Sequence, residues 1–181
     1  MNWRKRIPKI ITVLIFAGLL IGTAIPYQKK LLHLGEARQK ANSLKKFGFY
    51  LEPVNQEAGI DFRHQSPDLD PKLKNIAPQI ASMGASVSVV DYDKDGWEDL
   101  YFTNSRTGSQ NALYRNLHNG KFENVAPQLG LADLNQEGTG ESMGAVWADY
   151  DNDGYPDLLL YKWGQPELFH NEGGKRILAL L

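Results

Sequence analysis

Two short runs of aspartate carry the strongest chemical signal in this sequence. The runs hold Asp91, Asp93, Asp95 and Asp99, and then Asp149, Asp151, Asp153 and Asp157. Carboxylates at positions 1, 3, 5 and 9 of a nine-residue loop can turn their oxygens toward one cation, and glycine at position 6 permits the sharp turn. At position 7, the backbone carbonyls of Trp97 and Tyr155 would add a fifth oxygen. An all-oxygen ligand set favours calcium, so the sequence predicts two Ca²⁺ sites.

The same residues allow two other interpretations of these loops. An EF-hand needs Glu at position 12 and flanking helices, but Phe102 and Leu160 stand there and both flanks are typical of strands. A polar hairpin turn would use the same Asp and Gly residues for turn chemistry alone. Neighbouring carboxylates about 4 Å apart repel by roughly 1 kcal/mol per pair in water, and by more when partly buried. Four such groups in each loop therefore favour a bound cation over a simple turn.

The acidic loops belong to a longer internal repeat. The segment 91–100 (DYDKDGWEDL) recurs as 149–158 (DYDNDGYPDL), with seven of ten positions identical. Three further matches keep the same order: 82–85 with 142–145, 113–116 with 168–171, and 54–60 with 125–131. Ordered similarity in four places indicates a duplicated structural unit.

The elements that must position the loops are predicted to be strands. Short apolar runs precede each loop at 87–90 and 145–148, and follow it at 100–103 and 158–161. Segments 112–115 and 121–124 flank Asn119-Gly120, a dipeptide that favours a type I′ hairpin turn. About four short strands per 55–60 residues suit the blade of a β-propeller. The predicted fold is all-β: a partial propeller of about two to two and a half blades of four short antiparallel strands.

The chain has a basic head and an acidic body. Residues 1–46 contain ten Lys and Arg and one acidic residue, whereas residues 47–181 contain ten basic and twenty acidic residues. An acidic body argues against nucleic acid as a partner, because phosphate binding requires a basic face. The absence of cysteine excludes disulfide scaffolds, thiolate metal sites and cysteine nucleophiles.

Residues 1–27 are predicted to be a signal-anchor or a signal peptide. Four basic residues precede the uncharged run 10–25, which as a helix would span about 24 Å. Trp3 and Tyr27 bracket the run as interfacial anchors would, which favours a retained transmembrane helix. The small residues at 22–24 keep cleavage open, and a buried core helix is the third interpretation. Basic residues lie on both sides of the run, so charge alone does not orient it.

Residues 28–46 are predicted to form a basic linker helix, because apolar residues recur there at spacings of three and four. The interpretations are a basic stalk against lipid headgroups or a solvated linker, and we favour the linker.

Because cytosolic calcium is scarce, calcium loops place the body outside the cell or in the periplasm.

The acidic loops between strands, the Met-Gly-Ala approach at 83–85 and the hairpin 113–122 together resemble FG-GAP/VCBS repeats, the calcium-loop blades of integrin-α-like β-propellers. The segment 59–64 (GIDFRH) resembles the ASPIC/UnbV, cartilage-acidic-protein-like branch. The resemblance covers about residues 49–176 and implies a propeller, calcium held by the ten loop positions named above, and an extracytoplasmic binding or adhesion role. It divides region 47–181 into units of about 49–121 and 122–176.

The chain departs from this pattern at two points. Met-Gly-Ala stands approximately where the family has Gly-Ala-Pro. A propeller also needs at least four blades, whereas only about two to two and a half repeat units fit into this chain. The second hairpin is expected to break off near Lys175-Arg176-Ile177, leaving an incomplete C-terminus and a chain that resembles a truncated member. Further blades would then come from a longer chain.

No enzyme motif emerges from the sequence: nucleophile elbow, zinc-protease helix and P-loop are all missing. The four histidines, at 33, 64, 118 and 170, are scattered and are expected in solvent rather than as ligands.

The function predicted is a membrane-anchored, calcium-binding module for a protein or glycan ligand, without catalysis. The alternatives are the non-catalytic portion of a secreted polysaccharide-active enzyme and a fragment without independent function.

Overall fold

The computed structural model describes residues 27–28, 30–68, 70–73, 75–76 and 84–180. The chain divides into two compact units, Met1–Pro53 and Val54–Leu181, and each is described by itself below. The predicted signal-anchor or signal peptide over 1–27 lies outside the described residues except for Tyr27. Within the described ranges, no helix combines the length and apolar character needed to cross a membrane.

The first unit is helical at residues 27–28 and 30–47, close to the predicted 28–46. The helix ends at Gly48, whose positive φ of 77° and N–H bond to the Leu44 carbonyl (3.0 Å) form a glycine cap. Its side chains are almost all exposed, and Leu31, Leu34 and Leu44 keep about half of their surface in solvent. Within its own unit, the helix is therefore exposed to solvent, and its role as a linker stays a prediction.

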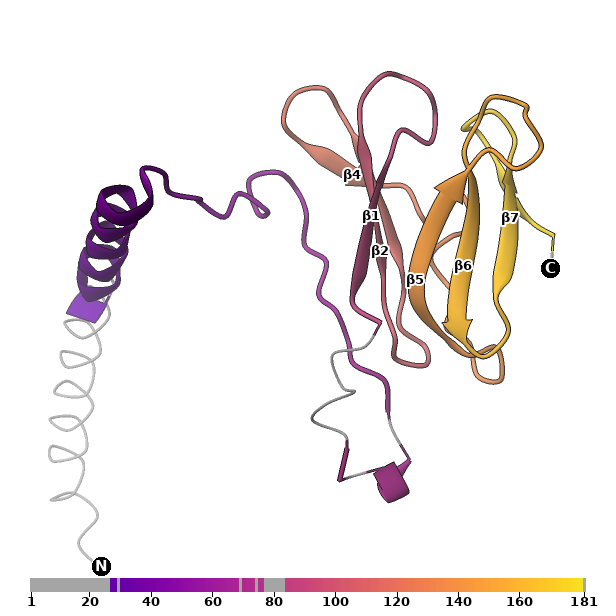
Figure 1. The fold of residues 1–181 in the computed structure, drawn as a ribbon, viewed down its shortest axis with the longest axis horizontal. Coiled ribbons are helices and arrows are strands. Elements are labelled where there is room, and N and C mark those ends of the chain that lie inside the picture. Colours follow the sequence, from indigo (N-terminus) through magenta and orange to yellow (C-terminus); the bar gives the residue numbers. More distant parts are fainter. Residues whose placement is uncertain (1–26, 29, 69, 74, 77–83, 181) are drawn as a thin grey trace, which may run out of the picture. The chain divides into compact units, whose positions relative to one another are not determined.

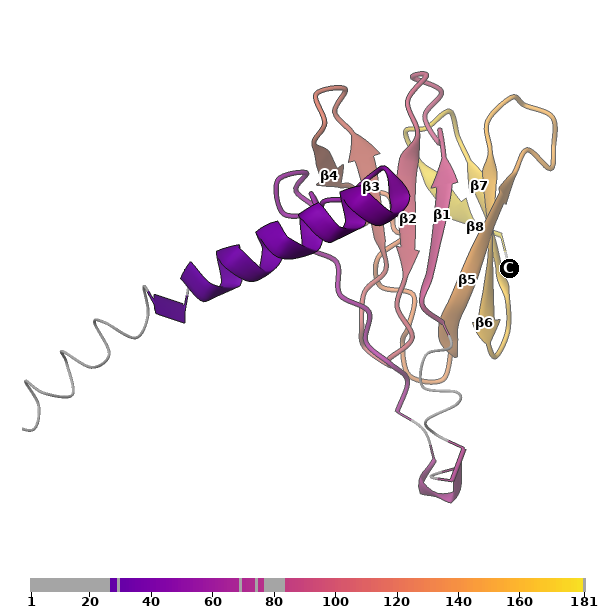
Figure 2. The same cartoon turned by 60° about the vertical axis from the view of Figure 1, so that its left-hand side comes forward.

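The second unit contains two four-stranded antiparallel sheets, each made of consecutive strands (Figures 1 and 2). Sheet 1 has the order β1 (Ser86–Val90), β2 (Asp99–Thr103), β3 (Ala112–Asn116), β4 (Phe122–Asn124). Sheet 2 has the order β5 (Glu141–Ala148), β6 (Asp157–Trp163), β7 (Glu167–Asn171), β8 (Ile177–Ala179). A short 3₁₀ turn, η2 (Pro71–Leu73), precedes them. The all-β prediction of two four-stranded units is confirmed.

Three details of the sequence prediction were wrong. The second hairpin does not break off, because Ile177 pairs with Asn171 and β8 completes sheet 2. The unit boundary between 121 and 122 falls too early, because β4 pairs with β3 and belongs to sheet 1. The β3–β4 turn is not a type I′ turn on Asn119-Gly120: the left-handed residues are His118 (φ 60°) and Gly120 (φ 77°).

The repeat extends to backbone hydrogen bonds before each sheet. In the segment 54–60, the Ala58 amide bonds to the Val54 carbonyl at 2.8 Å. In the matching segment 125–131, the Leu129 amide bonds to the Val125 carbonyl at 3.2 Å. In both segments, the backbone amide of the last residue also donates a hydrogen bond to the carbonyl of the second residue. Similar sequences at 54–60 and 125–131 therefore fold into the same local turn.

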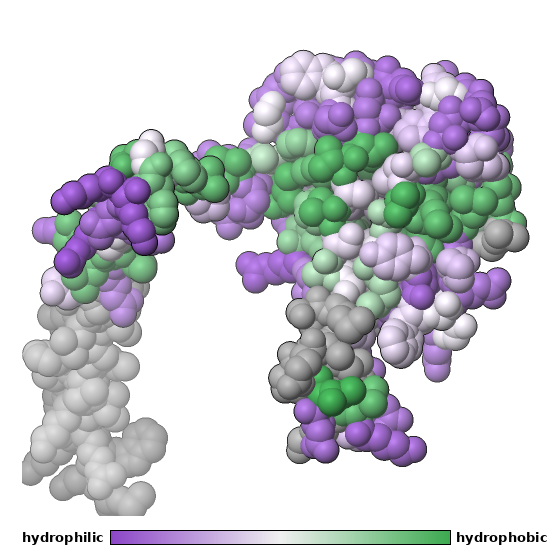
Figure 3. Space-filling view, in the orientation of Figure 1, coloured by the Kyte–Doolittle hydropathy of each residue, from purple (hydrophilic) through white to green (hydrophobic). Residues whose placement is uncertain are grey.

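The core lies between the two sheets and is closed by the segment that joins them. Tyr101, Leu113, Leu131, Leu158 and Leu160 are fully buried there. Trp147 packs edge-on against Tyr101, with ring centroids 5.7 Å apart, from the facing sheet. Aromatic pairs in this geometry contribute about 0.5–1.5 kcal/mol beyond burial of their area. Figure 3 shows hydrophobic surface across the middle of the strands and hydrophilic side chains at the upper loop ends.

Candidate metal centre

Residues 91–99, the first acidic loop, join β1 to β2, and residues 149–157, the second acidic loop, join β5 to β6. The two loops share one backbone course. Gly96 and Gly154, at position 6, have positive φ values of 89° and 97°, as the sequence predicted. Lys94 and Asn152, at position 4, also adopt left-handed backbone (φ 59° and 61°), which the sequence reasoning missed. Asn is enriched in this conformation and was the available signal.

The aspartates at position 1 organise each loop by accepting two backbone hydrogen bonds. Asp91 accepts from the amides of Asp95 (3.1 Å) and Gly96 (3.0 Å). Asp149 accepts from the matching amides, those of Asp153 (3.2 Å) and Gly154 (3.0 Å). These bonds use one lone pair of each carboxylate oxygen, and carboxylate oxygens can accept more than one contact.

The aspartates at position 9 are buried and tie the loop to the neighbouring hairpin. Asp99 accepts hydrogen bonds from the amides of Tyr92 (3.3 Å) and Asn116 (2.8 Å). Asp157 accepts from the matching amides of Tyr150 (3.1 Å) and Asn171 (2.8 Å). Burial raises the pKa of Asp99 to about 6, because desolvation disfavours a carboxylate more than these two hydrogen bonds stabilise it. A cation beside the carboxylate would remove that penalty.

Three of the four carboxylates converge in each loop. In the first loop the oxygens of Asp91, Asp93 and Asp99 lie within 4.8 Å of one another, and in the second loop so do those of Asp149, Asp151 and Asp157. Asp93 Oδ1 is buried and has no hydrogen-bond partner among the described residues. Desolvation, and next the Asp95 carboxylate, raises the pKa of Asp93. The predicted positions 1, 3 and 9 therefore form one cluster of oxygens in both loops.

The aspartates at position 5 are turned toward other partners. Each accepts the amide of position 7: Asp95 from Trp97 at 2.9 Å and Asp153 from Tyr155 at 2.8 Å. Asp95 Oδ2 also lies 2.7 Å from His118 Nε2, and the imidazole stacks on the Trp97 ring at 5.0 Å. Asp95 is not part of the cluster formed by Asp91, Asp93 and Asp99, whereas one oxygen of Asp153 lies within 4.8 Å of ligand atoms of Asp151 and His170. The roles predicted for position 5 and for the carbonyls of Trp97 and Tyr155 stay predictions.

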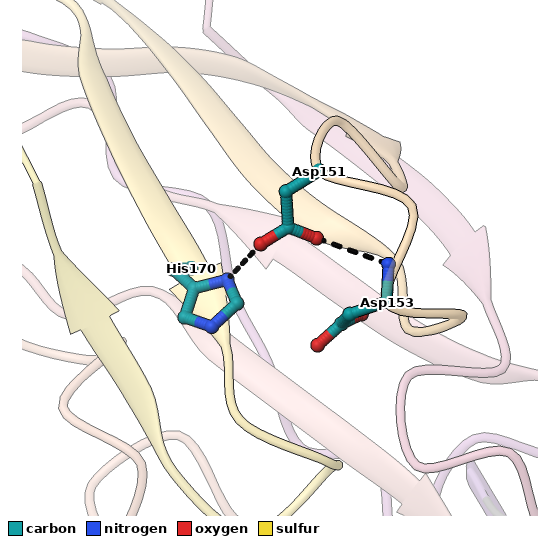
Figure 4. A group of neighbouring side chains, drawn as sticks. All are labelled: Asp151, Asp153 and His170. Atoms are coloured by element: carbon teal, nitrogen blue, oxygen red, sulfur yellow. Dashed lines mark hydrogen bonds and ion pairs between the residues drawn. The ribbon is translucent and has the colours of Figure 1, made fainter.

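A histidine stands beside the second acidic loop, contrary to the expectation that the histidines are scattered in solvent. His170 Nδ1 lies 3.2 Å from both Asp151 Oδ2 and Asp157 Oδ1. Figure 4 shows Asp151 between the His170 ring and the Asp153 amide, to which its other oxygen is bonded at 3.2 Å. Register places His170 there, because β7 pairs with β6 and brings position 170 beside the start of β6. The signal in the sequence was the repeat match of 113–116 with 168–171, in which His170 corresponds to Arg115, another basic residue.

A repeated asparagine follows that position and was not assigned a role from the sequence. Asn116 donates from its side-chain amide to the Glu98 carbonyl at 3.2 Å. Asn171 donates to the matching carbonyl of Pro156 at 2.9 Å. Both asparagines thus brace the last turn of their acidic loop before the buried aspartate at position 9.

Comparison with known proteins points to the same repeat. Residues 91–160 match the family model described as FG-GAP-like repeat, which spans both acidic loops. Human integrin alpha-6 is 34% identical to this chain over 91 residues, an alignment that covers 44% of this chain and 7% of the integrin. The chain therefore spans a small part of that relative. The segment that carries both acidic loops belongs to the FG-GAP-like repeat family.

Proposed function

We propose that this protein is an extracytoplasmic, calcium-binding FG-GAP repeat module that binds a protein or glycan ligand without catalysis. The repeats and the likeness to an integrin α chain support a binding module outside the cytoplasm. The proposal includes a membrane anchor in residues 1–27, which rests on their sequence alone. Membership of the ASPIC/UnbV branch likewise rests on the segment 59–64.

The observation that carries the calcium proposal is the buried, unpartnered oxygen of Asp93 within a cluster of three carboxylates. A buried polar atom without a partner costs about 1–3 kcal/mol, and more when it carries charge. Calcium accepts six to eight oxygen ligands at 2.3–2.6 Å in flexible geometry. One ion would give Asp93 Oδ1 its partner and offset the mutual repulsion of Asp91, Asp93 and Asp99.

The donor chemistry fits calcium better than a transition metal in the first loop, because its cluster contains oxygens only. The second loop offers a matching oxygen cluster and also His170 beside Asp151. Calcium would use Asp149, Asp151 and Asp157 there. We therefore propose two sites, one in each acidic loop, that stabilise the sheets presenting the ligand-binding surface.

The test is calorimetric calcium titration of the full chain after EDTA treatment, with thermal unfolding in parallel. We expect two bound ions and a rise in melting temperature, since binding adds about 2.7 kcal/mol of stability when free calcium is 100 times Kd. Asp93→Asn and Asp151→Asn should each remove one site. Glu57→Gln, which removes one negative charge from an exposed position outside both loops, is the matched control.

The outcomes decide whether the two acidic loops bind calcium. Loss of one site in each loop variant, with the control unchanged, supports two calcium loops. A folded wild-type chain that neither binds calcium nor shifts its melting temperature overturns the proposal. Binding that survives in Asp93→Asn with Asp151→Asn combined would place calcium elsewhere.

A further inference from the structure

The two sheets of the second unit pack through unlike faces. Sheet 1 presents to sheet 2 the face that carries Ser88, Tyr101, Thr103 and Leu113. Sheet 2 presents in return the face that carries Ala145, Trp147, Leu158, Leu160 and Phe169. The contact is specific, because the Trp147 indole N–H donates to Ser88 Oγ at 3.1 Å and the ring packs on Tyr101. Unlike faces in contact make this a head-to-tail arrangement.

Each sheet has one face covered by the other sheet and one open face. Because the two sheets are repeats, the open face of each sheet is equivalent to the covered face of the other. Strand register fixes the equivalence: Val89 pairs with Leu100 in sheet 1 as Trp147 pairs with Leu158 in sheet 2. In the same way, the Ser88–Tyr101 pair matches Val146–Leu159. The open face of sheet 2 is therefore equivalent to the covered face of sheet 1, and its main residues are Val146, Leu159, Tyr161 and Leu168. The open face of sheet 1 is equivalent to the covered face of sheet 2, and its main residues are Val87, Val89, Leu100 and Phe102.

Exposure shows how much apolar surface the open face of sheet 2 leaves in water. Tyr101 and Thr103 are 0% and 1% exposed on the covered face of sheet 1, whereas the equivalent Leu159 and Tyr161 are 43% and 48% exposed. Val146, opposite Leu159, is 53% exposed. Contiguous apolar side chains on a strand face mark an interaction surface.

The open face of sheet 1 shows the same contrast along β1. Val87 and Val89 are 53% and 61% exposed, while Ala145 and Trp147 at the equivalent places pack against the core. The other half of this face is covered by the segment 54–65, where Phe62 stacks on Phe102 at 5.0 Å. The matching segment 125–131 helps form the surface with which sheet 2 meets sheet 1. The open face of sheet 1 thus combines exposed valines on β1 with a covering segment, as the covered face of sheet 2 combines β5 with the segment 125–131.

We propose that a second copy of this chain packs the open face of its sheet 1 onto the open face of sheet 2, head to tail. The internal contact between the sheets is the template, so Val89 of one copy takes the place of Trp147 and lies over Val146 and Leu159 of the other. Both surfaces are apolar where they would meet, and burial contributes about 25 cal/mol per Å². Because the two open faces differ, a pair of copies still has one open face of sheet 1 and one open face of sheet 2. Association therefore continues until the ring of sheets closes.

The chain contains no cysteine, so single cysteine variants give an unambiguous test. Full-length Val89→Cys and Leu159→Cys proteins are mixed in mild detergent and treated with a short thiol-specific cross-linker. We expect a product of twice the 20.3 kDa chain mass in the mixture and none with either variant alone. Lys121→Cys, at an exposed position on the β3–β4 turn, replaces Val89→Cys as the matched control. Light scattering of the wild-type chain gives its mass independently.

Each result decides the proposal. Cross-linking in the mixed pair alone, with a wild-type mass of at least two chains, supports head-to-tail packing. A dimer formed by Leu159→Cys alone or by Val89→Cys alone shows like faces in contact and overturns it. Equal cross-linking with Lys121→Cys shows random collision and overturns it, as does a wild-type chain that stays monomeric with no cross-linked product.

Discussion

The side-chain amide of Asn171 donates a 2.8 Å hydrogen bond to the backbone carbonyl of Tyr92, 79 residues earlier in the chain. Asn171 ends β7 of sheet 2, and Tyr92 lies in the first acidic loop, so this bond joins one sheet to the loop of the other. The same amide bonds to Pro156 in its own loop. Gly174 adds to this junction: a Cβ there would lie 2.5 Å from Asp93 Cα. The first acidic loop is therefore supported by the hairpin of the second sheet.

Replacing Asn171 with alanine should lower the free energy of unfolding by about 1–3 kcal/mol, because two carbonyls lose a buried donor. Denaturant unfolding measures the loss. Asn116→Ala is the matched control, since its amide donates to the Glu98 carbonyl within its own blade. We expect the smaller loss there. Equal losses in the two variants would mean that the bond to Tyr92 adds nothing to stability.

Gly174→Ala should destabilise the protein more than Gly96→Ala. Both glycines have positive φ, so alanine costs about 1–2 kcal/mol at each for left-handed backbone. At Gly96 a new Cβ meets nothing within 4 Å, whereas at Gly174 it collides with Asp93. Thermal unfolding with and without calcium is the measurement. If the two variants melt at the same temperature, the packing of Gly174 on Asp93 is not tight.

Lys162 is predicted to be essential to sheet 2, because its ammonium group is buried with three acceptors. It donates to the Leu134 carbonyl, Thr139 Oγ1 (3.1 Å) and Glu167 Oε1 (2.8 Å), and its side chain is 0% exposed. Lys162→Met should cost about 3 kcal/mol, at the low end for a broken buried ion pair, since Glu167 keeps some solvent contact. A double variant with Glu167→Gln should recover part of the loss. No recovery in that denaturation cycle would contradict a coupled pair.

Stability should fall in mild acid partly through His64. The ring is half-buried, its Nε2 lies 3.1 Å from Ser105 Oγ, and burial lowers its pKa below the ordinary value. The unfolded chain takes up this proton near pH 6.5, before the folded protein does, so protonation favours unfolding as the pH falls through that value. His64→Gln should therefore lose less stability than the wild type between pH 7.5 and 5.5.

The control for this pH effect is His33→Gln, on the exposed helix of the first unit. Denaturant unfolding of the wild type and both variants at the two pH values gives the stability that each protein loses on acidification. If His64→Gln and the wild type lose equal stability on acidification, His64 does not contribute to the acid sensitivity.

Local patterns made much of this protein predictable from its sequence. Alternating carboxylates with glycine at position 6 predicted the two acidic loops, because both features act within nine residues. The left-handed glycines Gly96 and Gly154 follow directly from that spacing. The repeat predicted two equivalent units, and their strands follow from short apolar runs beside turn residues. The last hairpin was wrong because short β8 carries a weak strand signal, and the unit boundary was wrong because it cut through the segment 121–124, which had been predicted to pair with 112–115.

Contacts between side chains that are far apart in the sequence depend on strand register and on the packing of the two sheets. His170 lies beside Asp151, Asn171 reaches Tyr92, and Lys162 is buried with Glu167 because strand register and sheet packing place them there. A register shift of one residue would move every strand side chain to the other face, so sequence spacing within one strand cannot fix such contacts. It was likewise the packing of the sheets that covered Tyr101 and left its counterpart Leu159 open. Local spacing is sufficient to predict the loops and the repeat, whereas the stacking of the two sheets fixes which sheet faces are covered and which distant residues contact each loop.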